Sequence, residues 1–174
     1  MTMLSRNRLL GLALAALVLI ADQAIKWYVT GPLALREVGD QIVYNSIFNL
    51  TRTNNYGVSL GIFTAKSEAM RWALVAMTAA IAVVVLVWLL RERKLGEIVP
   101  LGMVLGGALG NIRDRAVFGY VIDYADLHFG DFQPFLVFNL ADAAITIGVV
   151  IILARSFLIR EKRGDAAGAP ATET

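Results

Sequence analysis

Long apolar runs separated by short polar stretches make up most of the chain. Four runs have the length or near-length of a membrane span: residues 9–28, 69–90, 98–112 and 135–159. Crossing about 30 Å of hydrocarbon takes about 20 mostly apolar residues at a helical rise of about 1.5 Å per residue. The third run is short unless its helix continues past the polar residues that follow it. The pattern therefore predicts four transmembrane helices.

The polar stretch between the first two spans predicts a second kind of structure. It covers residues 29–68 and carries apolar and aromatic residues at 42–44 and 47–48, which are typical of short strands. We therefore expect an α-helical membrane protein with a small β-containing platform in this loop. Residues 1–163 form one integral membrane domain. The Ala-, Gly-, Pro- and Thr-rich segment 164–174 cannot bury a core and is expected to be disordered.

The basic residues predict the orientation of the spans. They gather before span one, between spans two and three, and after span four, as Arg6, Arg8, Arg91, Arg93, Lys94, Arg160, Lys162 and Arg163. Cytoplasmic segments of membrane proteins carry an excess of Lys and Arg. Both termini are therefore expected in the cytoplasm, with the loops 29–68 and 113–134 on the outer side. The first run is expected to be a retained span, because the polar Asp22 and Lys26 at its far end do not resemble a cleavage region.

Composition narrows the classes of function. Hydrophobic residues make up 57% of the chain and charged residues only 17%, which fits a bilayer protein. The 16 basic and 14 acidic residues are too evenly balanced for a nucleic-acid binder. Without cysteine and with His128 as its one histidine, the chain is expected to need no metal or cofactor. The G-x-S-x-G match at residues 57–61 lacks the strand, helix and histidine base of a serine hydrolase.

Three polar residues converge at one depth in the predicted membrane. Asp22 and Asn111 each lie about 20 Å along their helices from the cytoplasmic side, and Asp142 lies about 25 Å along span four. Polar groups inside a membrane are costly, so they usually face a protein interior or a wet cavity and serve function. These residues predict a site in the outer part of the membrane.

Spacing by three or four residues assigns side chains to helix faces. Gly102, Gly106 and Gly110 form a smooth stripe suited to close packing against another helix. Gly107, Asn111 and Arg115 share a different face of the same helix. The two sets predict a packing face and a site face on span three.

Two further spacings concern ionisable residues. Asp22 and Lys26 are four apart in the order that favours an ion pair, so they form either a structural salt bridge or part of the chemistry. Asn139 and Asp142 are three apart, which lets the amide orient the carboxylate.

Asp123 lies in the second outer loop, which is short enough to fold back over span four. Asp123 and Asp142 would then meet at one membrane surface. Two carboxyl groups held together do not easily both ionise, so the pair can act as general base and general acid around a water. Asp126 and Asp131 are expected to be solvated loop acids, with Asp126 as a second candidate for the site.

Five sequence blocks in this order resemble one known family, the bacterial lipoprotein signal peptidases (signal peptidase II), which are membrane aspartic proteases. The blocks are DQAIK at 22–26, NYG at 55–57, GGALGNIRDR at 106–115, VIDY at 121–124 and FNLAD at 138–142. The resemblance covers residues 9–158. It implies that Asp123 and Asp142 are the catalytic dyad, and that other residues shape or support the site: Asp22, Lys26, Asn55, Gly107, Asn111, Arg115 and Asn139.

The resemblance also implies the substrate and the location. The substrate would be a prolipoprotein whose cysteine carries a diacylglyceryl group, cut on the N-terminal side of that cysteine. The enzyme would be a multi-pass protein of the bacterial inner membrane, in contact with membrane lipid, with its site at the periplasmic face. We expect a monomer.

Two other classes of function use similar residues. A proton-coupled transporter also places acids and lysines inside the membrane, but it needs polar groups through the full thickness. A non-enzymatic scaffold subunit would use the glycine stripe to pair helices.

Overall fold

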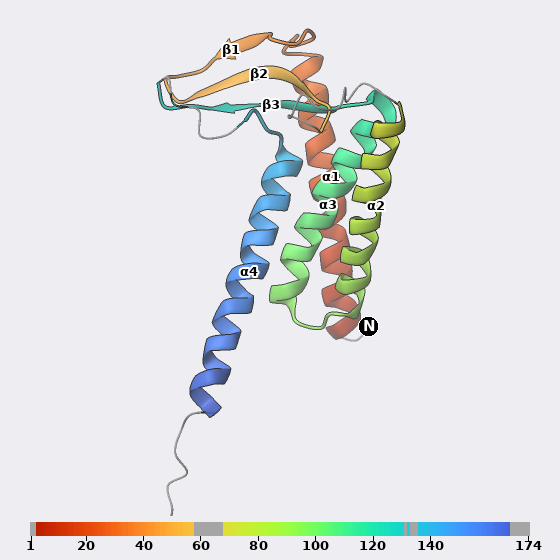
Figure 1. The fold of residues 1–174 in the computed structure, drawn as a ribbon, viewed down its shortest axis with the longest axis vertical. Coiled ribbons are helices and arrows are strands. Elements are labelled where there is room, and N and C mark those ends of the chain that lie inside the picture. The colour runs from red at the N-terminus through yellow and green to blue at the C-terminus, as the bar shows by residue number, and fades with distance from the viewer. Residues whose placement is uncertain (1–2, 58–67, 131, 133–135, 168–174) are drawn as a thin grey trace, which may run out of the picture.

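The computed structural model describes residues 3–57, 68–130, 132 and 136–167, and it confirms the predicted fold class. Its helices are α1 (Met3–Thr30), α2 (Glu68–Arg91), α3 (Leu95–Phe118) and α4 (Leu140–Ala167). Each contains a stretch long and apolar enough to cross a membrane. In Figure 1, α1, α2 and α3 lie side by side, whereas α4 leans away from them toward its C-terminal end. Ser59 of the G-x-S-x-G match, Asp131 and residues 168–174 of the predicted tail lie outside the described residues.

Helix α3 is the central helix of the bundle, and glycine makes this possible. A Cβ added at Gly102 would lie 2.6 Å from the Gly11 carbonyl oxygen of α1, and one at Gly106 would overlap the carbonyl of Ala15. On the other face, a Cβ at Gly107 would lie 2.5 Å from the Ala141 carbonyl oxygen of α4. Both predicted faces of α3 are therefore confirmed: one receives α1 and the other receives the start of α4.

Three antiparallel strands lie across one end of the bundle (Figure 1). They are β1 (Gln41–Val43), β2 (Phe48–Asn55) and β3 (Val121–Leu127), in the order β1-β2-β3. The strands expected in the first loop are confirmed, but β3 comes from the second loop and was not predicted. Ile42 pairs with Leu50, and Leu50 with Ala125, with an irregular register between Leu50 and Thr53.

A small apolar core fixes the sheet to the end of α1. It contains Val29 and Leu35 from α1 and the loop after it, together with Leu50, Tyr124 and Ala125 from the sheet. Val29 is 2% exposed. Burial of this core holds β3 over the ends of the helices, which sets the position of Asp123.

The third and fourth helices differ in length from the predicted spans. Helix α3 continues beyond Asn111 to Phe118, because Asn111 and Asp114 are buried against protein. Helix α3 ends at Gly119, which has a left-handed φ of 86° and donates its N–H to the Arg115 carbonyl. Helix α4 begins at Leu140 rather than at residue 135, because Phe138 is extended and pairs with Ala125. It continues to Ala167, four residues into the segment expected as a tail.

Candidate active site

Asp123 and Asp142 meet at the side chain and backbone of Asn139. The Asn139 Nδ2 donates to Asp123 Oδ1 at 2.6 Å. The Asn139 N–H donates to Asp142 Oδ2 at 3.3 Å, and the Asp142 N–H donates back to Asn139 Oδ1 at 2.9 Å. This reciprocal pair is a capping box, the standard way to satisfy free N–H groups at a helix start. The predicted contact between Asn139 and Asp142 is present, in the form of a helix cap.

The chain reaches this geometry because Phe138 adds to the edge of β3. Its carbonyl accepts the N–H groups of Tyr124 at 3.1 Å and Ala125 at 2.7 Å, and its N–H donates to the Ala125 carbonyl at 3.0 Å. The next residue, Asn139, is thereby placed beside Asp123. The Leu140 N–H donates to the Tyr124 hydroxyl at 3.1 Å, so β3 also holds the first turn of α4.

Asn111 extends the hydrogen-bond network from α3. Its Nδ2 donates to Asp142 Oδ1 at 2.8 Å, and its Oδ1 accepts a longer bond of 3.4 Å from Asn139 Nδ2. Asp142 therefore accepts hydrogen bonds on both oxygens. Buried polar groups require such partners, and a fully bonded network fixes the orientation of its members.

Burial and charge raise the pKa of Asp123 to about 6. Burial is the largest cause, and the negative charge of Asp142 is the second. Hydrogen bonds from Asn55 and Asn139 to the carboxylate act in the opposite direction. Asp123 is 1% exposed. A carboxyl with a raised pKa beside a second carboxyl matches the requirement for an acid and a base in one pair.

A cavity of about 300 Å³ opens beside Asp123. Its lining comes from the end of β2, the residues after it, β3 and the segment before α4: Thr53, Asn54, Asn55, Tyr56, Gly57, Asp123, Leu136 and Val137. The Gly57 N–H donates to Asn55 Oδ1 at 2.8 Å, which leaves the Asn55 amide group for Asp123. The predicted residue Asn55 is therefore in the site.

Arg115 lies next to Gly57 at the rim of this cavity. A Cβ added at Gly57 would lie 3.6 Å from the Arg115 Nη2, and Gly57 has a φ of 87° that favours glycine. Arg115 also interacts electrostatically with Asp123 and Asp142. Among the described residues, its buried Nε has no hydrogen-bond partner. An unpaired buried donor beside two carboxylates is available to a bound substrate.

A second ionic cluster lies beneath the dyad. The Lys26 Nζ is 2.7 Å from Asp22 Oδ2 and 2.7 Å from Asp114 Oδ2, and all three residues are at most 2% exposed. Gln23 Nε2 donates to both carboxylates at 3.0 Å. The predicted ion pair between Asp22 and Lys26 is present, and the structure adds Asp114 as its third member.

This cluster touches the dyad through the backbone. Asp22 Oδ1 accepts the Ala141 N–H at 3.1 Å, and Asp114 Oδ2 accepts the Ile122 N–H at 3.3 Å. Each bond is to the residue directly before a member of the dyad. Neither Asp22 nor Lys26 lines the cavity at Asp123, so their place in the structure is that of positioning residues.

Two expectations about polar residues need correction or addition. Asp126 is 5% exposed and accepts the Thr51 hydroxyl at 2.9 Å, so it is not a solvated loop acid. The reason is that residues 121–127 form a buried strand rather than a loop. Asp114 was missed as a site residue. It lies four residues after Gly110, on the face of α3 that meets α1, but spacing within α3 does not show that its partner is Lys26 of α1.

The ionisable residues of α1, α3 and α4 lie toward the helix ends and not along the middle of each helix. The sequence has no ionisable residue at 9–21 of α1, 98–110 of α3 or 143–154 of α4. A proton pathway would need polar groups along that length. Within the described ranges, no group of three His, Cys, Asp or Glu side chains is arranged to hold a metal ion.

Comparison with known proteins agrees with this geometry. The family model described as signal peptidase (SPase) II matches residues 14–158. The lipoprotein signal peptidase of Sphingopyxis alaskensis is 50% identical over 163 residues, which cover 94% of each chain. That of Rhizorhabdus wittichii is 53% identical, over 91% of this chain and 92% of its own. A bacterial membrane enzyme structure determined by the in meso method has a TM-score of 0.72 at 27% identity, over 94% of this chain and 93% of that chain. The chain therefore belongs to the signal peptidase II family.

Proposed function

We propose that this protein removes signal peptides from prolipoproteins as an aspartic endopeptidase, with Asp123 and Asp142 as its catalytic residues. The observation that carries the proposal is that one residue, Asn139, bonds to both carboxylates. It holds them together beside a cavity large enough for an extended peptide segment. Asn55, Asn111, Arg115 and Asn139 orient the two acids.

In the proposed reaction, the ionised member of the dyad takes a proton from a water held between the two carboxyl groups. The water oxygen attacks the scissile carbonyl carbon. The protonated member then gives its proton to the nitrogen of the departing cysteine as the C–N bond breaks. The raised pKa of Asp123 supports these separate roles of acid and base, because burial and the neighbouring Asp142 both favour its protonated form. A bound substrate displaces water from the cavity and favours the shared proton further.

The surroundings of the dyad support a lipid-modified substrate. Asp142 is in the first turn of a membrane-crossing helix, whereas Asp123 is on a strand outside the helices. The scissile bond therefore sits at the membrane boundary, where a diacylglyceryl group can remain among lipid chains. We propose that the cut falls on the N-terminal side of the cysteine that carries this group.

The distribution of basic residues supports the orientation. Arg91, Arg93 and Lys94 lie at the end of the bundle away from the sheet. By the positive-inside rule this end is cytoplasmic, so both termini face the cytoplasm and the dyad faces the periplasm of a bacterial inner membrane. We expect a monomer.

The test is cleavage of one diacylglyceryl-modified prolipoprotein by the purified protein. Cleavage is measured as the loss of the mass of the signal peptide from the precursor. Asp123→Asn and Asp142→Asn are expected to abolish cleavage while the protein still inserts and elutes normally. Asp126→Asn is the matched control, because it changes a buried acid on the same strand outside the site, and it should retain activity. Full activity in either dyad variant contradicts the catalytic assignment. Equal turnover of the unlipidated precursor contradicts the substrate class.

A further inference from the structure

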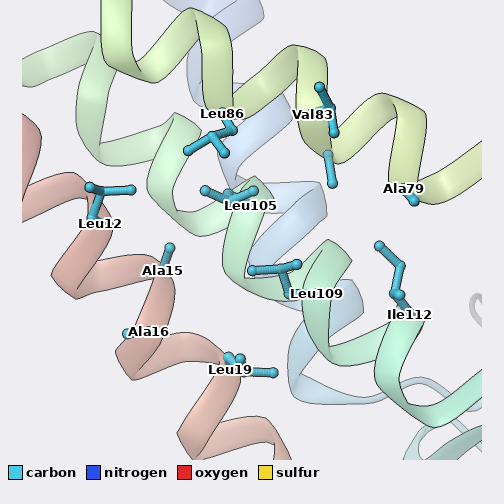
Figure 2. Close-up of a pocket in the computed structure, with 11 residues that line it drawn as sticks. Leu12, Ala15, Ala16, Leu19, Ala79, Val83, Leu86, Leu105, Leu109 and Ile112 are labelled. Atoms are coloured by element: carbon cyan, nitrogen blue, oxygen red, sulfur yellow. The ribbon is translucent and has the colours of Figure 1, made fainter. Parts of the chain in front are cut away.

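An apolar groove runs between α1 and α2, with α3 as its floor. It has a volume of about 480 Å³ and is lined by Leu12, Ala15, Ala16, Leu19, Ala79, Ala82, Val83, Leu86, Leu105, Leu109 and Ile112. Figure 2 shows Leu12 of α1 and Leu86 of α2 on opposite sides of the groove, with Leu105 of α3 between them. The groove shares no residue with the cavity at Asp123.

Small side chains keep the groove open. Helices α1 and α2 each pack extensively on α3 but barely touch one another. Ala15 and Ala16 on α1 face Ala79 and Ala82 on α2, where larger residues would fill the space. Because these helices cross the membrane, the occupant of an apolar groove on their surface is a hydrocarbon chain.

A polar hollow continues the groove toward the sheet. It is lined by Gln23, Lys26, Trp27, Thr30, Arg113, Phe118 and Ile122, with a volume of about 170 Å³. On α1, Leu12, Ala16, Leu19, Gln23 and Thr30 follow at intervals of three, four or seven residues, so they share one face of the helix. On α3, Arg113 lies four residues after Leu109 of the groove, so these two residues also share a face. The apolar groove and the polar hollow are therefore two parts of one furrow.

The hollow carries an available positive charge. The Arg113 side chain is 48% exposed, and its guanidinium lies 5.8 Å above the centre of the Phe118 ring. It hydrogen bonds to the neutral Gln23 Oε1. The nearest acid, Asp114, is 3.7 Å from Arg113 and 2.7 Å from Lys26, so it is already paired with a buried cation. Trp27, 68% exposed, stands at the same level, as expected of an aromatic residue at the headgroup boundary.

We propose that this furrow binds a phospholipid, with its phosphate on Arg113 and one acyl chain in the apolar groove. Arginine pairs well with phosphate, and basic pockets between membrane helices bind lipid headgroups. The stretch from Leu12 to Gln23 covers about 16 Å of helix, which is long enough to hold most of one acyl chain. The bound lipid stabilises the contact of α1 with α2, which protein atoms alone barely make.

The experiment titrates delipidated, full-length protein in detergent with phosphatidylglycerol and counts bound lipid by native mass spectrometry. One lipid is expected to bind more tightly than all others. Arg113→Gln is expected to raise its apparent Kd at least fivefold, with Arg113→Lys keeping most of the affinity. Arg36→Gln, which removes an exposed loop charge, is the matched control and should leave the Kd unchanged. Binding of diacylglycerol, which lacks the phosphate, should be weaker and insensitive to Arg113→Gln.

The groove is tested by filling it. Ala16→Phe from one wall and Ala79→Leu from the other are each expected to raise the apparent Kd at least fivefold. Ala13→Phe, at an exposed position of α1 outside the groove, should not. Equal affinity of Ala16→Phe, Ala79→Leu and Ala13→Phe would overturn the acyl-chain site. Equal affinity of Arg113→Gln and Arg36→Gln, or diacylglycerol binding as tightly as phosphatidylglycerol, would overturn the phosphate site.

Discussion

The Nδ2 of Asn139 lies 2.6 Å from the Oδ1 of Asp123, while the Oδ1 of the same asparagine accepts the backbone N–H of Asp142 and so caps helix α4. One residue thus performs two tasks that are usually separate: it starts a helix and it joins two acids. The tasks use different atoms, so they can be tested independently.

Asn139→Ser should separate these tasks. Serine retains an N-cap oxygen but has no amide to donate to Asp123. A hydrogen bond to a charged group contributes about 1.5–3 kcal/mol, so kcat should fall about 10- to 150-fold while the thermal midpoint changes little. Asn139→Ala also removes the cap and should lower stability by a further ~1 kcal/mol. An unchanged kcat in Asn139→Ser would contradict the orienting role of the amide.

The raised pKa of Asp123 predicts a pH dependence of stability. Its ordinary value is 3.8 and its value in the folded protein is about 6. Burial favours the protonated form, so its contribution to stability is fully present below pH 4 and is lost as pH rises through 6. The loss is up to about 3 kcal/mol. Asp123→Asn should therefore raise the thermal midpoint at pH 8 relative to the unmodified protein, and leave it nearly unchanged at pH 4. A lower midpoint for Asp123→Asn at pH 8 would contradict this.

Removing Lys26 should strongly destabilise the protein, because it leaves Asp22 and Asp114 buried with, among the described residues, only the half-exposed Arg113 as an ion-pair partner, 3.7 Å from Asp114. Breaking a buried ion pair from one side costs about 3–5 kcal/mol. Lys26→Met should lower the thermal midpoint sharply, and adding Asp114→Asn should recover part of the loss. Lys94→Met, at an exposed position, is the control. A midpoint for Lys26→Met equal to that of Lys94→Met would show that the cluster does not hold the helices together.

Gly102→Ala should weaken the contact of α1 with α3. The added Cβ would lie 2.6 Å from the Gly11 carbonyl oxygen, which is backbone and cannot easily move. Overpacking of this kind costs about 1–3 kcal/mol. At Gly96, by contrast, a Cβ meets only the guanidinium of Arg155, which can move aside. Thermal unfolding of both variants compares the two sites, and equal midpoints would contradict a tight α1–α3 contact at Gly102.

The sequence was most informative where spacing along a helix decides the outcome. Gly102 and Gly106 share a face at any helix boundary, so the close packing of that face against another helix could be predicted. The same holds for the separate face of Gly107 and Asn111, and for the ion pair of Asp22 with Lys26, although the partner helices of the two faces could not be predicted. The face of a helix on which a residue lies depends only on its spacing from nearby residues. The predicted faces therefore remain correct even when the predicted ends of the helix are wrong.

Strand β3 and the start of α4 could not be predicted in this way. Residues 121–126 are all buried, so β3 has no alternation of polar and apolar positions that would mark it as a strand. The apolar run at 135–138 was predicted to begin the fourth helix. In the structure, Phe138 is extended and pairs with Ala125 of β3. Such pairing depends on contacts between distant segments. Asp114 was overlooked for a related reason: its cation, Lys26, is on another helix.

The backbone hydrogen bonds between Phe138 and β3 also limit how the molecule can move. Because Phe138 is bonded to Tyr124 and Ala125, and the following residue is bonded to Asp123, the sheet and the beginning of α4 must shift as a single rigid block. Admission of a bulky substrate therefore cannot proceed by parting the two acids. The displacement is therefore expected to come from a part that is not bonded to that block, such as α2.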